Sequence, residues 1–258
     1  MQLYYCRLTL HDNVFFATRE MGILYETEKY LHNWALTYAF FASQYMAQPY
    51  RLQGELAQKP SYLDPNREQN LLALNPEGVY LFPARPLRYS YQVNTFKAAQ
   101  TNFYGKSKQF GEKGANRNYP INYGRAKELA VGSEYCTYLI GSDLMRVPRW
   151  IRVGKWMAKV KVRAELIPEA AIASGSGDYT CLHPLNPIDL PPTQELLVYN
   201  RIVMPPVSLI SQARLQGEYL QLRGEEWDEW RQDFPEIPSA VYLPKGVSYG
   251  ARSSANVR

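Results

Sequence analysis

Alternating apolar and polar residues at the start of the chain predict a β-strand over residues 3–10. Tyr4, Cys6 and Leu8 fall on its apolar side, and Tyr5 falls on the other. The pattern therefore predicts a strand with two distinct faces, with Arg7 and Thr9 on the same side as Tyr5.

A helical period follows over residues 27–42, where Leu31, Trp34 and Tyr38 recur on one face. Thr27 stands at the start as the expected N-cap, and an acidic residue follows it where the helix dipole favours negative charge. A strand followed by a helix is the opening of an α+β unit of the ferredoxin-like type.

Four further segments of the first part of the chain have strand-like composition: residues 78–82, 87–96, 134–140 and part of 150–166. Residues 48–76 are polar, contain scattered prolines and show no period, so they predict irregular structure.

A long insertion at about 97–125 separates two of these strands. It contains four glycines and few aliphatic residues, so it lacks the side chains that a core requires. We expect a projecting loop or hairpin, and such loops in compact domains usually carry function.

The composition changes after Ile167, where prolines become frequent and favour extended, loop-rich structure. An edge strand is expected over residues 196–203, between two groups of prolines, whereas Ala213 to Leu222 is only weakly patterned. We therefore predict an RRM-like domain over 1–166 and a proline-rich C-terminal part over 167–258 packed on the same body.

Composition limits the class of protein. With 258 residues, of which 46% are hydrophobic and 21% charged, the chain is typical of a folded protein. No run of about 20 apolar residues is present, and three scattered cysteines favour a reducing compartment over a disulfide framework. These features predict a soluble, cytoplasmic protein that binds no membrane.

The net charge of +5 is unevenly distributed. Residues 97–127 carry +6, and residues 144–164 carry +7 with no acidic residue, so the rest of the chain carries −8. Positive charge concentrated in two stretches of an otherwise acidic chain indicates a polyanionic partner. The alternative is two solvated faces neutralised by counterions.

Candidates for catalysis are few. His11, His32 and His183 show no metal-ligand spacing, and no CxxC, P-loop or dinucleotide-binding motif is present. We therefore expect no metal and no cofactor. His32 is the best candidate for a general base in RNA cleavage, although a histidine on a helix is more often structural.

Aromatic rings interleave with basic side chains in both positive stretches, a pattern typical of single-stranded nucleic acid binding. The candidate RNA-binding residues are Tyr104, Lys106, Lys108, Phe110, Lys113, Arg117, Tyr119, Arg125, Arg146, Arg149, Trp150, Arg152, Lys155, Lys159 and Lys161. Trp156 is excluded from this set, because a tryptophan on a strand is often part of the core.

Three stretches carry a resemblance to a known family: LYYCRLTLHDNVFFATREMGILYETEKYLHNWALTYA, NYPINYGRAKELAVGSEYCTYLI and RVPRWIRVGKWMAKVKV. They resemble the CRISPR-associated RAMP proteins, and among them the Cas five subunit (Csc one) of type I-D Cascade. The resemblance covers about two thirds of the chain, and the phrase HDNVFFATRE is its most distinctive part.

The resemblance implies an α+β, RRM-like domain that binds the 5′ handle of the CRISPR RNA in antiviral defence. It also implies contacts with the backbone RAMP subunit and the large subunit of a ribonucleoprotein effector complex, which meets target DNA as a whole. The insertion at 97–125 corresponds to the thumb-like hairpin of such proteins, and the strand bearing Lys159 and Lys161 to the adjacent RNA face.

This chain departs from the family pattern in two places. The glycine-rich loop near the C-terminus is reduced to residues 246–250, and no Lys-His pair of the kind used by repeat-cleaving relatives is present. We therefore expect binding without cleavage. Two alternatives stay open: a metal-independent repeat endoribonuclease using His32 or His11, and a protein–protein adaptor in which the acidic, tryptophan-bearing segment 225–230 is a docking surface.

Overall fold

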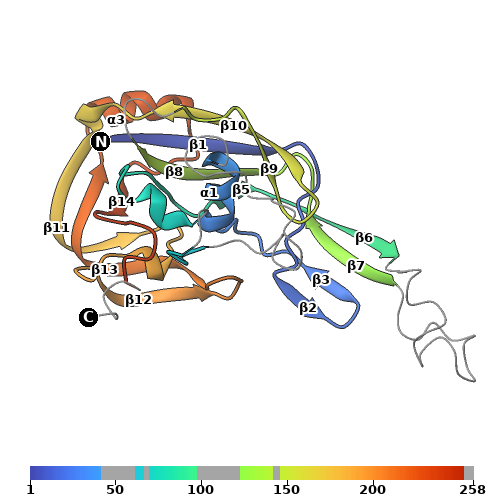
Figure 1. The fold of residues 1–258 in the computed structure, drawn as a ribbon. Helices are drawn as coiled ribbons and strands as arrows, with labels where there is room; N and C mark the ends of the chain where they lie inside the picture. The colour runs from blue at the N-terminus through green and yellow to red at the C-terminus, as the bar shows by residue number, and fades with distance from the viewer. Residues whose placement is uncertain (42–61, 67–69, 98–122, 142–145, 253–258) are drawn as a thin grey trace, which may run out of the picture.

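The computed structural model describes residues 1–41, 62–66, 70–97, 123–141 and 146–252, and within them it is a mixed α+β fold consisting mostly of sheet (Figure 1). The α+β expectation is confirmed, and the RRM-like topology stays a prediction. Two α-helices are present in these ranges: α1 (Asn33–Phe41) and α3 (Glu225–Trp230). Short 3-10 helices are η2 (Leu71–Leu74), η4 (Glu169–Ala171), η5 (Pro187–Asp189) and η6 (Arg231–Asp233).

The first sheet is built around the N-terminal strand. In spatial order its strands are β4 (Tyr80–Leu81), β8 (Glu134–Gly141), β1 (Gln2–Leu10), β10 (Ala158–Leu166) and β9 (Trp150–Val153), with β5 (Arg85–Arg88) also paired to β8. Strand β1 is antiparallel to both of its neighbours, so that Leu8 lies opposite Val162 on one side and Tyr135 on the other. The strands expected over 3–10, 78–82 and 134–140 are thus confirmed, and 150–166 is a two-stranded hairpin.

Tyr5, on the side of β1 that also carries Arg7 and Thr9, is fully buried. Its ring packs against Trp230 and Phe234, with ring centroids 6.1 and 5.1 Å away, and its hydroxyl donates a hydrogen bond to Glu236 at 2.7 Å. Residues near the C-terminus therefore cover this part of the sheet, which the local alternation of β1 does not reveal.

The first helix begins at Asn33, and the predicted start at Thr27 is wrong. Residues Leu24–Glu26 form strand β3, and the Thr27 hydroxyl accepts a hydrogen bond from the Phe16 backbone N–H at 3.1 Å. The chain then bends at residues 29–30 and reaches Leu31, which forms an isolated bridge with Ala84. Pairing with other segments therefore prevails over helix propensity in these residues.

The proline-rich part forms a second sheet where mostly loops were expected, and the edge strand expected over 196–203 is confirmed. Its strands are β11 (Ile172–Cys181), β13 (Leu209–Leu222) and β12 (Glu195–Ile202), with β14 (Val241–Pro244) also paired to β13. Gly175 in β11 lies opposite Tyr219 in β13, and a Cβ built on it would lie 2.5 Å from the Tyr219 ring. The tyrosine ring thus covers the glycine, which explains how a Gly- and Ser-rich stretch remains in a sheet. Figure 1 shows this sheet curling around one end of the molecule.

The third sheet carries the arm that extends away from the body in Figure 1. Its strands are β2 (Arg19–Met21), β3 (Leu24–Glu26), β7 (Tyr123–Leu129) and β6 (Tyr91–Lys97). Strands β6 and β7 pair antiparallel, and β7 pairs parallel to β3, which fixes the arm to the body. The arm leads to residues 98–122, which lie outside the described residues.

In the described part of the chain, no helix has both the length and the apolar character needed to cross a membrane. The three cysteines are free thiols, and all are buried. In the same ranges, no group of three or more His, Cys, Asp or Glu side chains is placed to hold a metal ion.

Candidate nucleic-acid interface

The hairpin β9–β10 presents basic side chains on one face and apolar ones on the other. Along β10, Lys159 and Lys161 are exposed, and the alternate residues Val160 and Val162 are buried in the core. This is the alternation that the sequence predicts for a strand with one face on a core.

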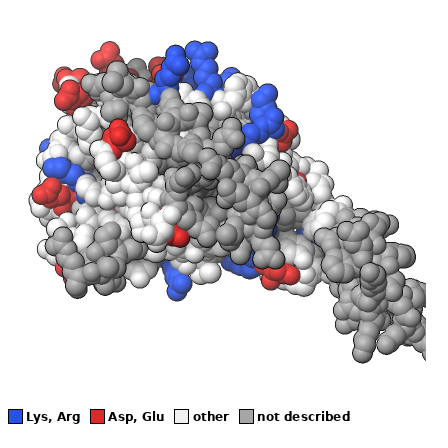
Figure 2. Space-filling view, viewed as in Figure 1, with Lys and Arg blue, Asp and Glu red and all other residues white. Residues whose placement is uncertain are grey.

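The register of the hairpin brings further candidates to the same face. Lys159 lies opposite Arg152, and Lys161 lies opposite Trp150. Directly opposed residues of antiparallel strands point to the same side, so these four side chains form one continuous surface. We call these four residues the basic sheet face. Lys and Arg side chains gather over β10 in Figure 2.

Carboxylates neutralise the part of the sheet beside this face. Arg7 pairs with Glu134 at 2.7 Å, and Arg163 pairs with Glu165 at 2.7 Å. Among the described residues, by contrast, no carboxylate forms an ion pair with the ammonium group of Lys159 or Lys161, although the Asp12 carboxylate accepts the Lys159 backbone N–H at 2.8 Å. The uncompensated charge is therefore concentrated at the end of the sheet nearest the β9–β10 turn.

Trp150 is 44% exposed and lies within this charge. The Lys159 ammonium is 4.2 Å from the centroid of its ring, and the His11 ring packs edge-on at 4.9 Å. These contacts hold the indole on the surface without burying it. An exposed aromatic ring between cations can stack on an unpaired base while the cations contact its phosphates.

Trp156 has a different environment, although it is 49% exposed. Its ring lies 4.5 Å from the Phe15 ring and 6.2 Å from the Phe96 ring on the arm. The same turn is fixed to Phe15 by the Lys155 backbone N–H, which donates to the Phe15 carbonyl at 2.7 Å. Trp156 therefore packs the β9–β10 turn against the base of the arm.

The other candidates differ in what the structure says of them. Those in the insertion, Tyr104, Lys106, Lys108, Phe110, Lys113, Arg117 and Tyr119, lie outside the described residues. Arg125 is exposed on β7, and Arg146, Arg149 and Lys155 are exposed around β9. The arm and the β9–β10 hairpin are thus the two described elements that carry candidates, and Trp156 joins them.

His32 has a structural environment. It immediately precedes α1, its Nδ1 accepts the Trp34 backbone N–H at 3.2 Å, and its Nε2–H donates to the Val207 carbonyl at 3.1 Å. Burial lowers the pKa of His32 to about 4. Because both ring nitrogens are bound to the backbone and the ring is buried, the predicted general base has no free nitrogen for a proton transfer.

The other two histidines differ sharply in exposure. His183 is buried, its Nε2–H donates to the Pro83 carbonyl at 2.7 Å, and burial lowers its pKa to about 3. His11 is exposed beside Trp150. His11 is therefore the histidine that a ribonuclease hypothesis must test.

The reduced glycine loop at 246–250 begins at the surface and ends in the core. Tyr249 is fully buried, its hydroxyl accepts the Leu81 backbone N–H at 3.0 Å, and the Gly250 N–H donates to Asp189 at 2.9 Å. Sequence reasoning did not single out Asp189, which joins this loop to the start of α1 through Asn33 at 2.8 Å. These contacts turn Tyr249 and the Gly250 N–H inward.

The acidic segment 225–230 is helix α3 and is fixed by its two tryptophans. Trp227 is fully buried and stacks on Trp230 with ring centroids 5.3 Å apart, while the acidic residues of the helix are exposed. This arrangement agrees with a solvated charged helix held by aromatic residues.

Taken together, the fold and the surface define a sheet-rich α+β protein whose basic face and aromatic side chain lie beside a projecting two-stranded arm. The sequence model of the type I-D CRISPR-associated protein Cas5/Csc1 family matches residues 1–252. The chain therefore belongs to this family, and the expectation drawn from the three resembling stretches is confirmed. No curated protein matches the sequence.

Proposed function

We propose that the protein is a non-catalytic, CRISPR RNA-binding subunit of a type I-D effector complex. It holds the 5′ handle of the RNA and caps the backbone filament next to the large subunit. Membership of the Cas5/Csc1 family supports the place in the complex. The basic sheet face supports the RNA contact, because Lys159 and Lys161 are exposed and their ammonium groups form no ion pair with a carboxylate of the described residues.

The arm gives the proposal its geometry. Strands β6 and β7 carry the insertion at 97–125, the proposed thumb, and Trp156 packs the basic hairpin against their base through Phe96. RNA bound along β9 and β10 would thus meet the arm where it leaves the body. Arg125, exposed on β7, then extends the positive surface along the arm.

Charge removal on the face tests the proposal. The double variant Lys159→Gln, Lys161→Gln should weaken binding of single-stranded repeat RNA, because two phosphate contacts are lost. Its slope of log affinity against log salt should fall by about 1.4, or about 0.7 for each contact. The matched control is Arg214→Gln, Lys245→Gln, which removes the same charge from the second sheet, where both residues pair with carboxylates. Equal salt slopes for the two double variants would place the RNA elsewhere.

A cleavage assay separates this role from the ribonuclease alternative. Wild-type protein incubated with repeat RNA in EDTA should leave the RNA at full length. A product that forms in EDTA and is lost in His11→Ala would instead establish metal-independent cleavage at the exposed histidine.

A further inference from the structure

Strand β12 is the edge of the second sheet, and it is unusually apolar for an exposed edge. In the described residues it pairs with β13 alone, so the backbone groups along its other side have no strand partner. Leu197, Val198 and Tyr199 are all exposed on it, and Val198 is 67% exposed. Apolar edge strands are templates for pairing with another chain, and proteins usually cover or charge them.

The exposure of three consecutive apolar residues has a cause in the register. The pairing of β12 with β13 shifts between Leu196 and Val198, and again between Val198 and Asn200. The first shift places an extra residue in β12 and the second places one in β13, and both break the normal alternation of buried and exposed side chains. The apolar surface continues past the strand into Val203, which is 60% exposed, and Leu182, which is 58% exposed.

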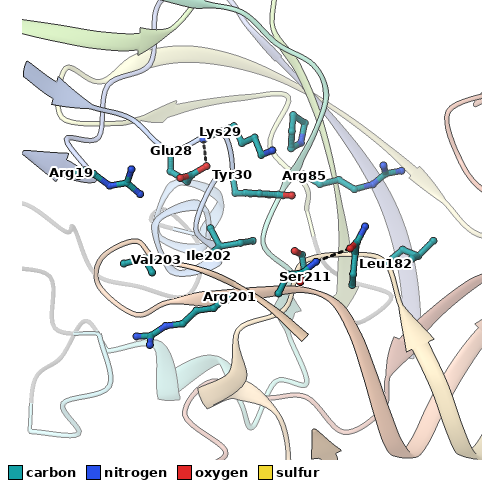
Figure 3. A pocket seen from close by; sticks show the side chains of 13 residues that line it. Arg19, Glu28, Lys29, Tyr30, Arg85, Leu182, Arg201, Ile202, Val203 and Ser211 are labelled. Atoms are coloured by element: carbon teal, nitrogen blue, oxygen red, sulfur yellow. Dashed lines mark hydrogen bonds between the residues drawn. The ribbon is translucent and has the colours of Figure 1, made fainter. Parts of the chain in front are cut away.

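A pocket of about 540 Å³ lies at the Asn200–Val203 end of β12 (Figure 3). Four cationic side chains from separate segments line it: Arg19 from β2, Lys29 from the segment before α1, Arg85 from β5 and Arg201 from β12. Arg19 lies 3.5 Å from Glu26, whereas no carboxylate of the described residues forms an ion pair with the Lys29 ammonium or the Arg201 guanidinium. Glu28 also lines the pocket, but the basic side chains outnumber it, and the net charge of the pocket is positive. The pocket therefore favours a carboxylate or a phosphate.

The surroundings of the pocket favour a polypeptide over a nucleic acid. Leu182 and Val203 line it directly, and aliphatic side chains neither neutralise phosphates nor stack on bases. Glu28 would also repel the phosphates of a continuous RNA backbone. In Figure 1, β12 runs along the opposite side of the molecule from β10, which carries the basic sheet face.

We propose that β12 binds an extended, apolar segment of another protein subunit of the effector complex by addition of a strand, and that a carboxylate of that segment enters the pocket at Lys29 and Arg201. Backbone hydrogen bonds along the edge would supply affinity, while Val198 and the cationic pocket would select the sequence. The inference rests on the proposed place of the protein in a multi-subunit complex.

Hydrogen exchange tests strand addition. The amides of β12 are measured in the isolated chain, in the chain with CRISPR RNA, and in the complete effector complex. The complex should slow exchange over residues 195–203 by at least about tenfold, and RNA alone should not. Protection by RNA alone would make the edge a nucleic-acid site, and unchanged exchange in the complex would remove the docking site; either result overturns the proposal. If the isolated chain binds no RNA, the proposed function is contradicted. The comparison of β12 exchange between the isolated chain and the complete complex still tests strand addition.

Variants test the two parts of the surface. Val198→Asp and Arg201→Gln should each lower the recovery of this subunit in the co-expressed complex by about tenfold, the effect of losing one interface anchor. The matched controls are Val131→Asp, at another exposed valine, and Arg223→Gln, at an exposed arginine just past the far end of β13, and both should assemble normally.

RNA binding by the isolated Val198→Asp and Arg201→Gln variants should equal that of the wild type. Two results would refute the assignment: normal assembly of both variants, or concentration-dependent dimerisation of the isolated wild-type chain that Val198→Asp abolishes. The second result would show that a copy of the same chain occupies β12.

Discussion

Asp189→Asn tests how the buried carboxylate joins the C-terminal loop to the first helix. Asp189 is fully buried, and its oxygens accept hydrogen bonds from the Gly250 N–H at 2.9 Å, Asn33 Nδ2 at 2.8 Å and Trp34 Nε1 at 3.1 Å. Burial raises its pKa from 3.8 to about 6, even though these donors favour the ionised form. Keeping this carboxylate ionised in the folded protein therefore lowers the free energy of unfolding near neutral pH.

The sign and size of this cost follow from linkage. Between the unfolded and folded pKa values, the folded protein holds a proton that the unfolded chain has lost, so stability falls as the pH rises. The fall contributed by Asp189 between pH 4 and pH 7 is about 2 kcal/mol. An asparagine at this position carries no charge, so the variant loses this pH dependence. Its amide N–H, however, faces one of the donors that the carboxylate accepts from, and the lost hydrogen bond costs about 1–3 kcal/mol at every pH.

Urea unfolding at pH 4, 5, 6 and 7 measures the difference. The free energy of unfolding of Asp189→Asn, relative to the wild type, should rise by about 2 kcal/mol from pH 4 to pH 7. Asp178→Asn is the control, because Asp178 is largely exposed and paired with Arg214 at 2.9 Å. If the wild type and Asp189→Asn show the same pH dependence, the carboxylate is not titrating in this range and the argument is wrong.

Three further predictions concern the arm, the basic hairpin and the buried histidine. Trp156→Ala should lower the free energy of unfolding by about 2 kcal/mol in urea titrations, whereas Trp150→Ala should cost less than about 1 kcal/mol and weaken RNA binding by about 1–3 kcal/mol in anisotropy titrations. Gly124→Ala should speed amide exchange in the arm, because its Cβ would lie 2.6 Å from the Phe96 ring. His32→Ala should lower the melting temperature and leave repeat RNA uncut, because it removes two hydrogen bonds to the backbone and no catalytic group.

Local periodicity correctly predicts strands that have one face on the core and one in solvent. It fails where residues distant in the sequence determine which side chains are buried. The alternation along β10 placed Lys159 and Lys161 on the outside, because one face of that strand packs on the core. The burial of Tyr5 depends on Trp230 and Phe234, which come from the far end of the chain. No local pattern of β1 contains that information.

The same limit applies to the second sheet and to the surfaces. Strand β13 was weakly patterned because polar residues interrupt it, and its pairing with β11 relies on Tyr219 covering Gly175 across the strands. Trp150 and Arg152 were predicted as candidates from the sequence, whereas their place on the same face as Lys159 and Lys161 follows only from the hairpin register. The pocket beside β12 combines side chains from separate segments, so the sequence gives no signal for it.

The most direct test of the RNA-binding proposal is purification of the tagged protein from its native host, with cross-linking of bound RNA and sequencing of that RNA. The account predicts small RNAs that share a uniform, repeat-derived 5′ end, other subunits of the effector complex, and cross-linked peptides from residues 146–163. Recovery of the complex with RNA cross-linked only to other subunits, or of the protein without RNA, would contradict it.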